Sequence, residues 1–195
     1  KKTFAIVHNV SDYNFINSLG FYKDYIFKTN GSGVDLENIK FKSLKNNKMK
    51  YILFVGRLIE DKGISEYVKL AELCKNSNFI FLIAGKFSNS NKSRIKKSAF
   101  LNLISDTKNL KFYESPDNID SLYNKCNVVV LPSYREGFSK VVLEANAHGR
   151  PVITFDTIGC GENIIEGKTG YIVEFKNIEV MLEKITMILK NYQYC

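Results

Sequence analysis

Apolar and polar positions alternate along this chain in blocks that predict strands and helices in turn. Short, mostly apolar runs occur at residues 51–55, 79–84, 110–113, 128–131 and 152–155. Segments with a helical spacing of apolar residues occur at residues 64–74, 92–105, 117–124, 139–148 and 178–189. Strands that are apolar throughout, instead of at every second position, are typical of a parallel sheet covered on both faces. The pattern therefore predicts one α/β domain with a doubly wound parallel sheet, beginning near residue 50.

The first 49 residues show a weaker pattern. Residues 1–30 contain two apolar stretches, FAIV and YIFK, with a predicted helix at residues 12–19 between them. This small α/β fragment has too few residues to bury a core of its own. Residues 31–49 are polar and begin with two glycines, which predicts a linker.

The composition is that of an ordinary globular protein. The 195 residues are 45% hydrophobic, which is enough for one good core. No apolar run approaches the roughly 20 residues that span a membrane, and the first residues do not form a secretory signal, so we expect a cytoplasmic protein. The four cysteines include no CxxC pair, which favours free thiols over a metal site.

The formal net charge of +8 favours an anionic partner. A phosphorylated small molecule and an acidic membrane surface both suit this charge, and so does a lysine-rich surface that meets only water. We expect no nucleic-acid partner, because the sequence contains no aromatic RNA-binding motif, zinc finger or arginine-rich arm.

Arg57 and Lys62 lie in the loop GRLIEDKG, between a predicted strand and a predicted helix. In parallel sheets, ligands bind beyond the carboxyl ends of the strands. Two cations beside a helix N-terminus, whose N–H groups can donate hydrogen bonds, suit a diphosphate. The alternative is that both side chains lie at the surface and pair with Glu60 and Asp61.

Glu136 and Glu144 flank the start of the helix predicted at residues 139–148, for which Ser139 is the candidate N-cap. Glu144 lies five residues into this helix, which places it about 7–8 Å along the helix axis from Ser139. A nucleotide sugar beside this helix would place its sugar at Glu136, its diphosphate at the helix N-terminus and its ribose at Glu144, because carboxylates accept hydrogen bonds from vicinal hydroxyls. Alternatively, Glu144 pairs with Lys140 one turn back and Glu136 only stabilises the helix dipole.

The remaining candidate positions carry weaker signals. Gly159 and Gly161 do not complete a dinucleotide-binding motif, so an ordinary glycine-rich turn is the simpler interpretation. His8 and His148 are isolated, and a surface or packing role is favoured for both. The sequence contains no DxD motif, the usual acidic anchor for a metal-bound diphosphate, and we therefore expect no metal.

Three ordered motifs carry a resemblance to a known family. They are GRLIEDKG at residues 56–63, LPS-x2-EGF-x5-EA-x3-G-x-PVI at residues 131–153, and EN-x3-GKTGYIV at residues 162–173. With the segment GSGVDLENIKF at residues 31–41, they resemble the C-terminal, donor-binding domain of the family-4 retaining glycosyltransferases. The resemblance covers most of residues 30–190.

This resemblance implies a GT-B fold, in which two Rossmann-like domains enclose the active site, and sugar transfer from a nucleotide donor with retention and without a metal. Arg57 and Lys62 match the pair that binds the donor diphosphate. Glu136 matches the residue at the donor sugar, and Glu144 matches the residue at the ribose. The implied catalytic residues are Glu136, Arg57 and Lys62. Five further positions are implied to line the donor, and these are Gly56, Gly137, Phe138, Ser139 and Lys140. The base pocket is implied near residues 113–115.

The resemblance also implies a domain organisation and a set of partners. Residues 1–30 would be a remnant of the N-terminal acceptor domain, residues 31–49 the linker, and residues 50–195 the nucleotide-sugar-binding domain. The rest of the acceptor domain would then be a partner, and the fragment alone would be inactive. We expect a UDP-sugar donor in preference to a GDP-sugar and no other cofactor. The hexose would pass to a glycan or lipid-linked acceptor in surface polysaccharide synthesis, with peripheral contact at the inner face of an anionic membrane. The alternative is a module that binds a nucleotide or nucleotide sugar without catalysis.

Overall fold

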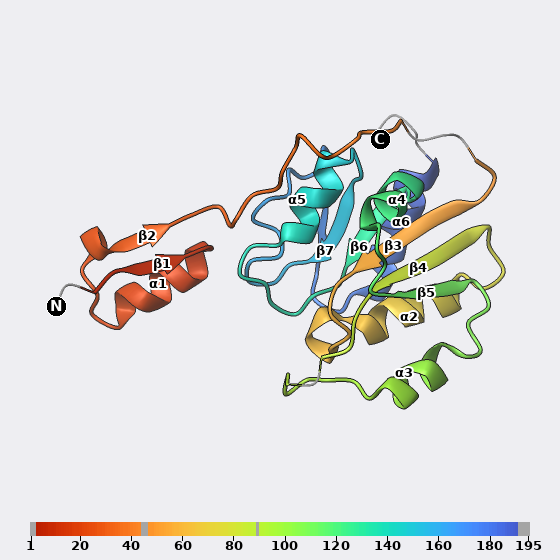
Figure 1. Ribbon diagram of the computed structural model, residues 1–195, viewed down its shortest axis with the longest axis horizontal. Coiled ribbons are helices and arrows are strands. Elements are labelled where there is room, and N and C mark those ends of the chain that lie inside the picture. Colours follow the sequence, from red (N-terminus) through yellow and green to blue (C-terminus); the bar gives the residue numbers. More distant parts are fainter. Residues whose placement is uncertain (1–2, 44–46, 89, 191–195) are drawn as a thin grey trace.

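The computed structural model describes residues 3–43, 47–88 and 90–190, which form two parallel sheets (Figure 1). The larger sheet has the strand order β5-β4-β3-β6-β7-β8. Its strands are β3 (Lys50–Val55), β4 (Phe79–Gly85), β5 (Leu110–Glu114), β6 (Val128–Leu131), β7 (Val152–Phe155) and β8 (Gly170–Val173). All neighbouring strands in it are parallel. The predicted doubly wound, Rossmann-like sheet is thereby confirmed.

The chain leaves the centre of the large sheet in two directions. From β3 it proceeds outward through β4 to β5, then returns to β6 beside β3 and proceeds through β7 to β8. The strand order therefore reverses between β3 and β6. In such sheets a crevice opens at the carboxyl ends of the two strands on either side of the reversal. This topology brings the loops after β3 and β6 together at one crevice.

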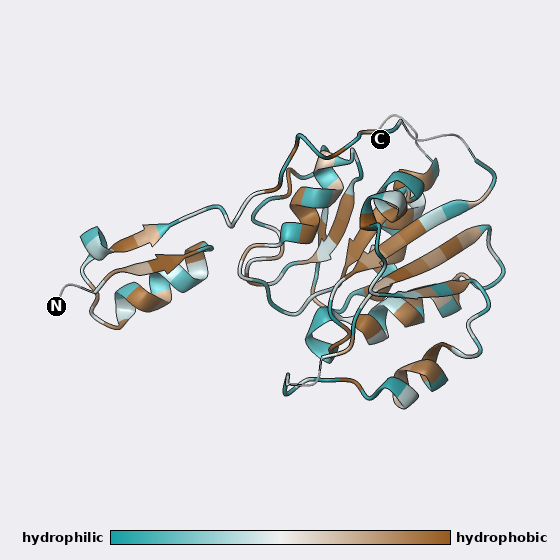
Figure 2. Ribbon diagram, in the orientation of Figure 1, coloured by the Kyte–Doolittle hydropathy of each residue, from teal (hydrophilic) through white to brown (hydrophobic). Residues whose placement is uncertain are grey.

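Helices cover both faces of the large sheet. They are α2 (Ile64–Leu73), α3 (Lys97–Ile104), α4 (Ile119–Lys125), α5 (Lys140–Ala147) and α6 (Ile178–Lys190). Side chains of α2 and α6 pack on one face, and side chains of α4 and α5 pack on the other. On β3, Ile52 and Phe54 point into the first layer and Leu53 into the second. Because both faces are covered, the central strands are mostly apolar along their length, as Figure 2 shows, with Lys50 in β3 and Thr154 in β7 as buried polar residues.

The N-terminal residues form a small separate unit (Figure 1). Strands β1 (Ala5–Val7) and β2 (Ile26–Lys28) pair in parallel, and helix α1 (Val10–Ser18) connects them. Asn9 caps this helix, because its side chain accepts a hydrogen bond from Asp12 N at 2.7 Å. Several large apolar side chains of the unit are exposed: Phe4, Ile6, Val10, Phe15, Leu19 and Phe27. The unit therefore buries little of its own apolar surface.

The helix predicted at residues 92–105 is wrong in its first part, because α3 begins only at Lys97. Local hydrogen bonds compete with helix formation there: the Asn91 side chain accepts from Ser93 N at 2.8 Å. Ser93 O also accepts from Glu60 N at 2.8 Å, which ties this segment to the loop after β3. A tertiary contact and a polar turn together override the apolar spacing.

The other predicted elements are present within two residues of their predicted bounds. One strand, β8, was not predicted, because its sequence GYIV follows directly on a glycine-rich loop. A Cβ built at Gly170 would lie 1.9 Å from Val152 O, so glycine is required where β8 begins beside β7. Cys74, Cys126 and Cys160 are buried and form no disulfide, which agrees with the prediction of thiols, and Cys195 lies outside the described residues.

Candidate functional site

Three loops meet at the crevice between β3 and β6, and they follow β3, β6 and β7. The first two touch through their backbones, since Tyr134 N donates to Asp61 O at 2.8 Å. A Cβ built at Gly63 would lie 1.9 Å from Pro132 O, and Gly63 has a φ of 70°. Only a glycine fits such a close approach at this backbone conformation. The loops after β3 and β6 are therefore held in direct contact.

Lys62 and Glu136 form an ion pair that joins the loops after β3 and β6. The two side chains are 17% and 12% exposed, so the pair is largely shielded from water. The alternative in which Lys62 pairs at the surface with Glu60 or Asp61 is wrong. The contact joins two candidate residues that lie 74 positions apart in the chain.

Arg57 lies at a cavity of about 350 Å³ next to the carboxyl ends of β3, β4 and β5. Its side chain is exposed and forms no ion pair with any residue that the structure describes. The cavity is lined by Val55, Gly56, Arg57, Ala84, Gly85, Lys86, Ser115, Pro116 and Ile119. Ser115 belongs to the segment at residues 113–115 to which the family resemblance assigns the base pocket.

The loop after β7 supports the backbone of Glu136. Glu136 N donates to Ile158 O at 2.9 Å, and a Cβ built at Gly159 would lie 2.0 Å from Glu136 O. Asn163 Nδ2 also donates to Ser139 O at 3.0 Å, at the far end of the same loop. Gly159 permits a close approach between two protein loops because it has no Cβ. Its φ of 74° is a second reason why this position favours glycine.

Glu144 lies on α5 with its carboxylate held by two other side chains. The Tyr123 hydroxyl, from α4, donates to Glu144 Oε2 at 2.9 Å, and Lys140 Nζ lies 3.5 Å from Glu144 Oε1. The pairing of Glu144 with Lys140, which was the alternative to a ribose-binding role, is therefore present. It leaves the Glu144 side chain 24% exposed, beside a cavity of about 200 Å³ that Ile119 also lines. Ile119 lines the cavity at Arg57 as well.

Burial, together with the nearby charge of Glu144, raises the pKa of Tyr123. The hydroxyl therefore keeps its proton at neutral pH and acts as a donor. Burial also raises the pKa of the Cys160 thiol, which lies behind the loop of Glu136 with its Sγ 3.5 Å from Ser133 O. Cys160 is consequently a protonated, buried side chain.

Ser139 occupies the N-cap position of α5, as predicted, but its side chain caps none of the described backbone amides. The residue is buried, and its backbone oxygen accepts from Asn163 in the loop after β7. Lys140 begins the helix with its side chain 61% exposed. The side chain of Ser139 thus does not satisfy the first-turn N–H groups of α5.

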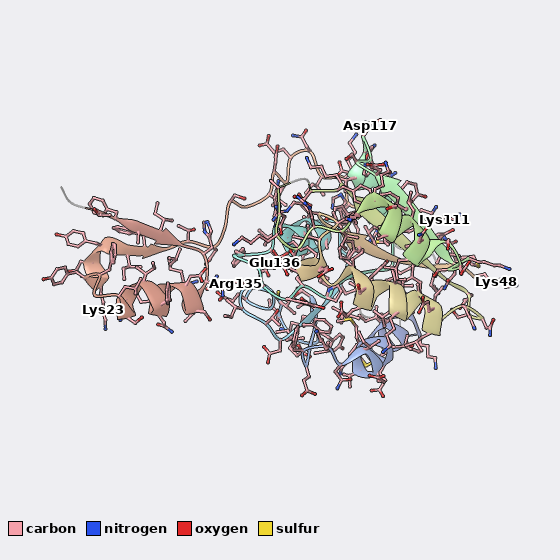
Figure 3. The ribbon with its side chains drawn as sticks, turned by 90° about the horizontal axis from the view of Figure 1, so that it is seen from below. Lys23, Lys48, Lys111, Asp117, Arg135 and Glu136 are labelled. Atoms are coloured by element: carbon pink, nitrogen blue, oxygen red, sulfur yellow. The ribbon has the colours of Figure 1, made fainter. Side chains whose placement is uncertain are left out.

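The N-terminal unit contacts the loop that carries Glu136. Asn9 Nδ2 donates to Gly137 O at 2.9 Å, and Asp12 forms an ion pair with Arg135. Figure 3 shows Arg135 and Glu136 on the side of the large sheet that faces the N-terminal unit. The start of α1 therefore lies directly against the candidate site.

Two further contacts strengthen this junction. Val10 N, at the first turn of α1, donates to Glu162 Oε1 at 3.0 Å. A Cβ built at Gly31, which begins the predicted linker, would lie 2.7 Å from Cδ1 of Phe138. The ring of Phe138 thus packs against Gly31, and the predicted donor-lining role for this position concerns its backbone.

The structure thus divides the predicted site residues into two groups. Lys62 and Glu136 are in contact at the crevice, and Lys140 and Glu144 are in contact on α5. Sequence reasoning missed Tyr123, because the residue that it contacts lies 21 positions away and no local pattern marks the pair. It also assigned Gly159 to an ordinary turn. Within the described ranges there is no cluster of three or more metal-ligating side chains and no helix able to span a membrane.

Residues 35–195 match the family model described as glycosyl transferases group 1. This match covers more than half of the chain. The chain belongs to the glycosyl transferases group 1 family. The fold and the crevice described above are thus those of a group 1 glycosyltransferase domain.

Curated relatives of this group 1 domain are named as glycosyltransferases. The chain is 33% identical over 199 residues to the capsular polysaccharide biosynthesis glycosyltransferase CapM of Staphylococcus aureus, covering 95% of this chain and 49% of that protein. It is 27% identical over 208 residues to the N,N'-diacetylbacillosaminyl-diphospho-undecaprenol alpha-1,3-N-acetylgalactosaminyltransferase of Campylobacter jejuni, covering 98% of this chain and 54% of that protein. The chain spans about half the length of these relatives.

Solved structures share the fold. TarM superposes with a TM-score of 0.81 at 24% identity, over 98% of this chain and 37% of that chain. HepE of Anabaena, in complex with UDP and glucose, superposes with a TM-score of 0.83 at 16% identity, over 98% of this chain and 55% of that chain. At these identities the similarity establishes the fold of the group 1 domain.

Proposed function

We propose that this chain is the donor-binding part of a family-4 glycosyltransferase with GT-B architecture, which transfers a hexose with retention and without a metal. The Lys62–Glu136 pair at the topological reversal of the sheet carries this proposal. A donor diphosphate would replace Glu136 as the partner of Lys62. The freed carboxylate would then accept hydrogen bonds from the hydroxyls of the donor sugar. Binding of the diphosphate to Lys62 would therefore favour binding of the sugar to Glu136.

The chemistry of transfer gives each cationic group a role. When the bond from the anomeric carbon to the diphosphate oxygen breaks, negative charge develops on the diphosphate and positive charge on the sugar ring. Arg57, Lys62 and the first-turn N–H groups of α5 would stabilise the diphosphate, most strongly in the transition state. Glu136 would orient the sugar and favour its positive charge. Backbone groups of Gly56, Gly137, Phe138, Ser139 and Lys140 would line the donor.

The two cavities that Ile119 lines suit the nucleoside. We assign the base to the cavity at Arg57 and Ser115 and the ribose to the carboxylate of Glu144. A UDP-sugar is the proposed donor. HepE, which has the same fold, has been solved with UDP-glucose, and TarM of S. aureus with UDP.

The acceptor is proposed from the relatives and from the N-terminal unit. A CapM-like role in capsular polysaccharide synthesis implies a glycan acceptor, and the Campylobacter relative is named for a diphospho-undecaprenol acceptor. A lipid-linked acceptor would bring the enzyme to the inner membrane face, where the +8 charge favours peripheral contact with anionic lipid. The exposed apolar side chains of residues 4–27 would pack against the rest of an N-terminal acceptor domain.

Calorimetric titration of the chain with uridine, UDP, GDP and UDP-glucose tests the proposal. We expect UDP to bind more tightly than uridine, because the diphosphate meets Lys62 and Arg57, and more tightly than GDP. Equal affinity for uridine and UDP would contradict the diphosphate site.

In the enzyme that contains both domains, NMR of the product anomer tests retention, and turnover in the presence of EDTA tests metal independence. Binding without turnover in that enzyme would leave a nucleotide-sugar-binding module.

A further inference from the structure

We propose that Tyr123 is a positioning residue that fixes the carboxylate of Glu144 for the donor ribose. This inference rests on the proposed function, in which Glu144 binds the ribose hydroxyls. It is carried by a direct contact between two helices, since the Tyr123 hydroxyl donates to Glu144 Oε2 at 2.9 Å. A single hydrogen bond leaves the other acceptor sites of the carboxylate for a ligand, because a carboxylate has about four.

Tyr123 is itself held in place by two neighbouring side chains. The residue is fully buried, and its ring stacks on that of His148 at a centroid distance of 4.8 Å. His148 Nδ1 lies 2.7 Å from Glu144 O, so the stacked pair contacts Glu144 at both its backbone and its carboxylate. Arg150 Nε donates to Tyr123 O at 2.8 Å and fixes the backbone of the tyrosine. The hydroxyl is thus presented from a rigid support.

Fixing the carboxylate has a physical purpose. An exposed glutamate on a helix samples several rotamers. A ligand that binds only one of them loses affinity, because fixing the side chain in that rotamer costs conformational entropy. Lys140 Nζ, at 3.5 Å and on a side chain that is 61% exposed, restrains Glu144 only weakly. A buried, neutral tyrosine donor restrains the rotamer before the ligand arrives and leaves the negative charge in place.

Another buried tyrosine, Tyr67, shows that this geometry differs from ordinary core packing. Tyr67 is also fully buried, but its hydroxyl donates to the backbone oxygens of Ile52 and Leu82 at 2.9 and 3.0 Å. That hydroxyl donates only to backbone carbonyl groups of β3 and β4, inside the core beneath α2. Tyr123 instead donates to a carboxylate that borders a cavity, and its hydroxyl therefore acts on a side chain at the surface of that cavity.

The test measures affinities for UDP and 2'-deoxy-UDP in the parent chain, in Tyr123→Phe and in the matched control Tyr67→Phe. Phenylalanine keeps the ring and its stacking on His148 and removes only the hydroxyl. We expect Tyr123→Phe to weaken UDP about fivefold to tenfold and 2'-deoxy-UDP less than about twofold, since one charge-assisted hydrogen bond is involved. Tyr67→Phe is expected to lower thermal stability and to leave the ratio of the two affinities unchanged.

A double-variant cycle completes the test. In a Glu144→Ala background, Tyr123→Phe is expected to have no further effect on UDP affinity, because the hydroxyl then has no carboxylate to position. The same fold-loss for UDP and 2'-deoxy-UDP in Tyr123→Phe, or no loss for either, would overturn the positioning role. If the parent chain itself does not distinguish the two nucleotides, the ribose role of Glu144 fails and this inference fails with it. If the parent binds no UDP, the proposed function fails first.

Discussion

The regions around Glu136 and Glu144 hold two carboxylates by opposite means. Glu136 lies in a loop and pairs with Lys62, a cation on another loop. Glu144 lies on a helix and accepts from Tyr123, a neutral donor in the buried layer between α4 and α5. The first partner is itself suited to a phosphate, whereas the second is not.

This difference separates an exchangeable contact from a fixed one. A ligand that binds Lys62 necessarily changes the partner of Glu136, so that region rearranges its charges on binding. The hydrogen bond from Tyr123 can persist when Glu144 contacts a ligand, so that region is preorganised. The loop of Glu136 therefore needs support from its neighbours, and it receives it from the loop after β7 and from the N-terminal unit.

The largest expected effect comes from removing that loop support. Gly159→Ala places a Cβ 2.0 Å from Glu136 O, whereas no described atom lies within 4 Å of a Cβ built at Gly167, which has a similar φ of 72°. Gly167→Ala should cost about 1–2 kcal/mol from backbone strain alone. Gly159→Ala should cost about 1–3 kcal/mol more in urea unfolding, because the clash adds to the same strain. If both variants lost the same free energy of unfolding, the loop of Glu136 could move away from the added methyl group without cost.

Removal of the exchangeable cation should have the next largest effect. Lys62→Ala should weaken UDP about 10- to 100-fold and leave uridine almost unchanged, because one charge-assisted contact is worth about 1.5–3 kcal/mol. Lys69→Ala, which removes an exposed lysine from α2, is the control for general charge. Calorimetry with both ligands distinguishes the two variants. If Lys62→Ala weakened uridine as much as UDP, Lys62 would not act through the diphosphate.

Neutralising each glutamate in turn contrasts the two regions directly. Glu136→Gln should leave UDP affinity unchanged or raise it about twofold to threefold, since Lys62 loses a competitor for the phosphate. Glu144→Gln should lower UDP affinity about fivefold to tenfold through weaker bonding to the ribose. The measurement is calorimetric titration of both variants with UDP. Losses of equal size would remove the distinction between exchangeable and fixed carboxylates.

The smallest effect is expected at the junction with the N-terminal unit. Asp12 and Arg135 are 32% and 59% exposed, so screening by solvent limits their ion pair to at most about 1 kcal/mol. Arg135→Ala should therefore change UDP affinity less than about threefold. Titration at low and at high salt provides the check, because the difference between variant and parent should shrink at high salt. A tenfold loss would show that the N-terminal unit sets the position of Glu136.

Much of the fold was predictable because its signals are local. The apolar runs of β3, β4, β6 and β7 and the spacing of α2 and α6 specify buried strands and amphipathic helices in sequence order. The predictions failed where a distant contact decided the backbone. Residues 92–96 do not join α3 because the loop after β3 binds them, and β8 forms because Gly170 can approach β7.

The candidate site was predictable as a set of residues and not as a set of contacts. Sequence motifs placed Arg57, Lys62, Glu136 and Glu144 beside strand ends and a helix start. Whether Lys62 meets Glu136 depends on β3 and β6 lying side by side, and the pairing of strands is not encoded by any one strand. Tyr123 was missed for the same reason, since α4 carries no pattern that refers to α5.

By itself, then, the sequence determined which segments are strands and helices and which charged residues lie at their ends, because these depend on neighbours within a few positions. The tertiary structure alone decided which charges face one another. It joined Lys62 to Glu136 across the reversal of the sheet and Glu144 to Tyr123 between two helices. Those pairings arise from the strand order and from close approaches at Gly63 and Gly159, which only the assembled fold brings about.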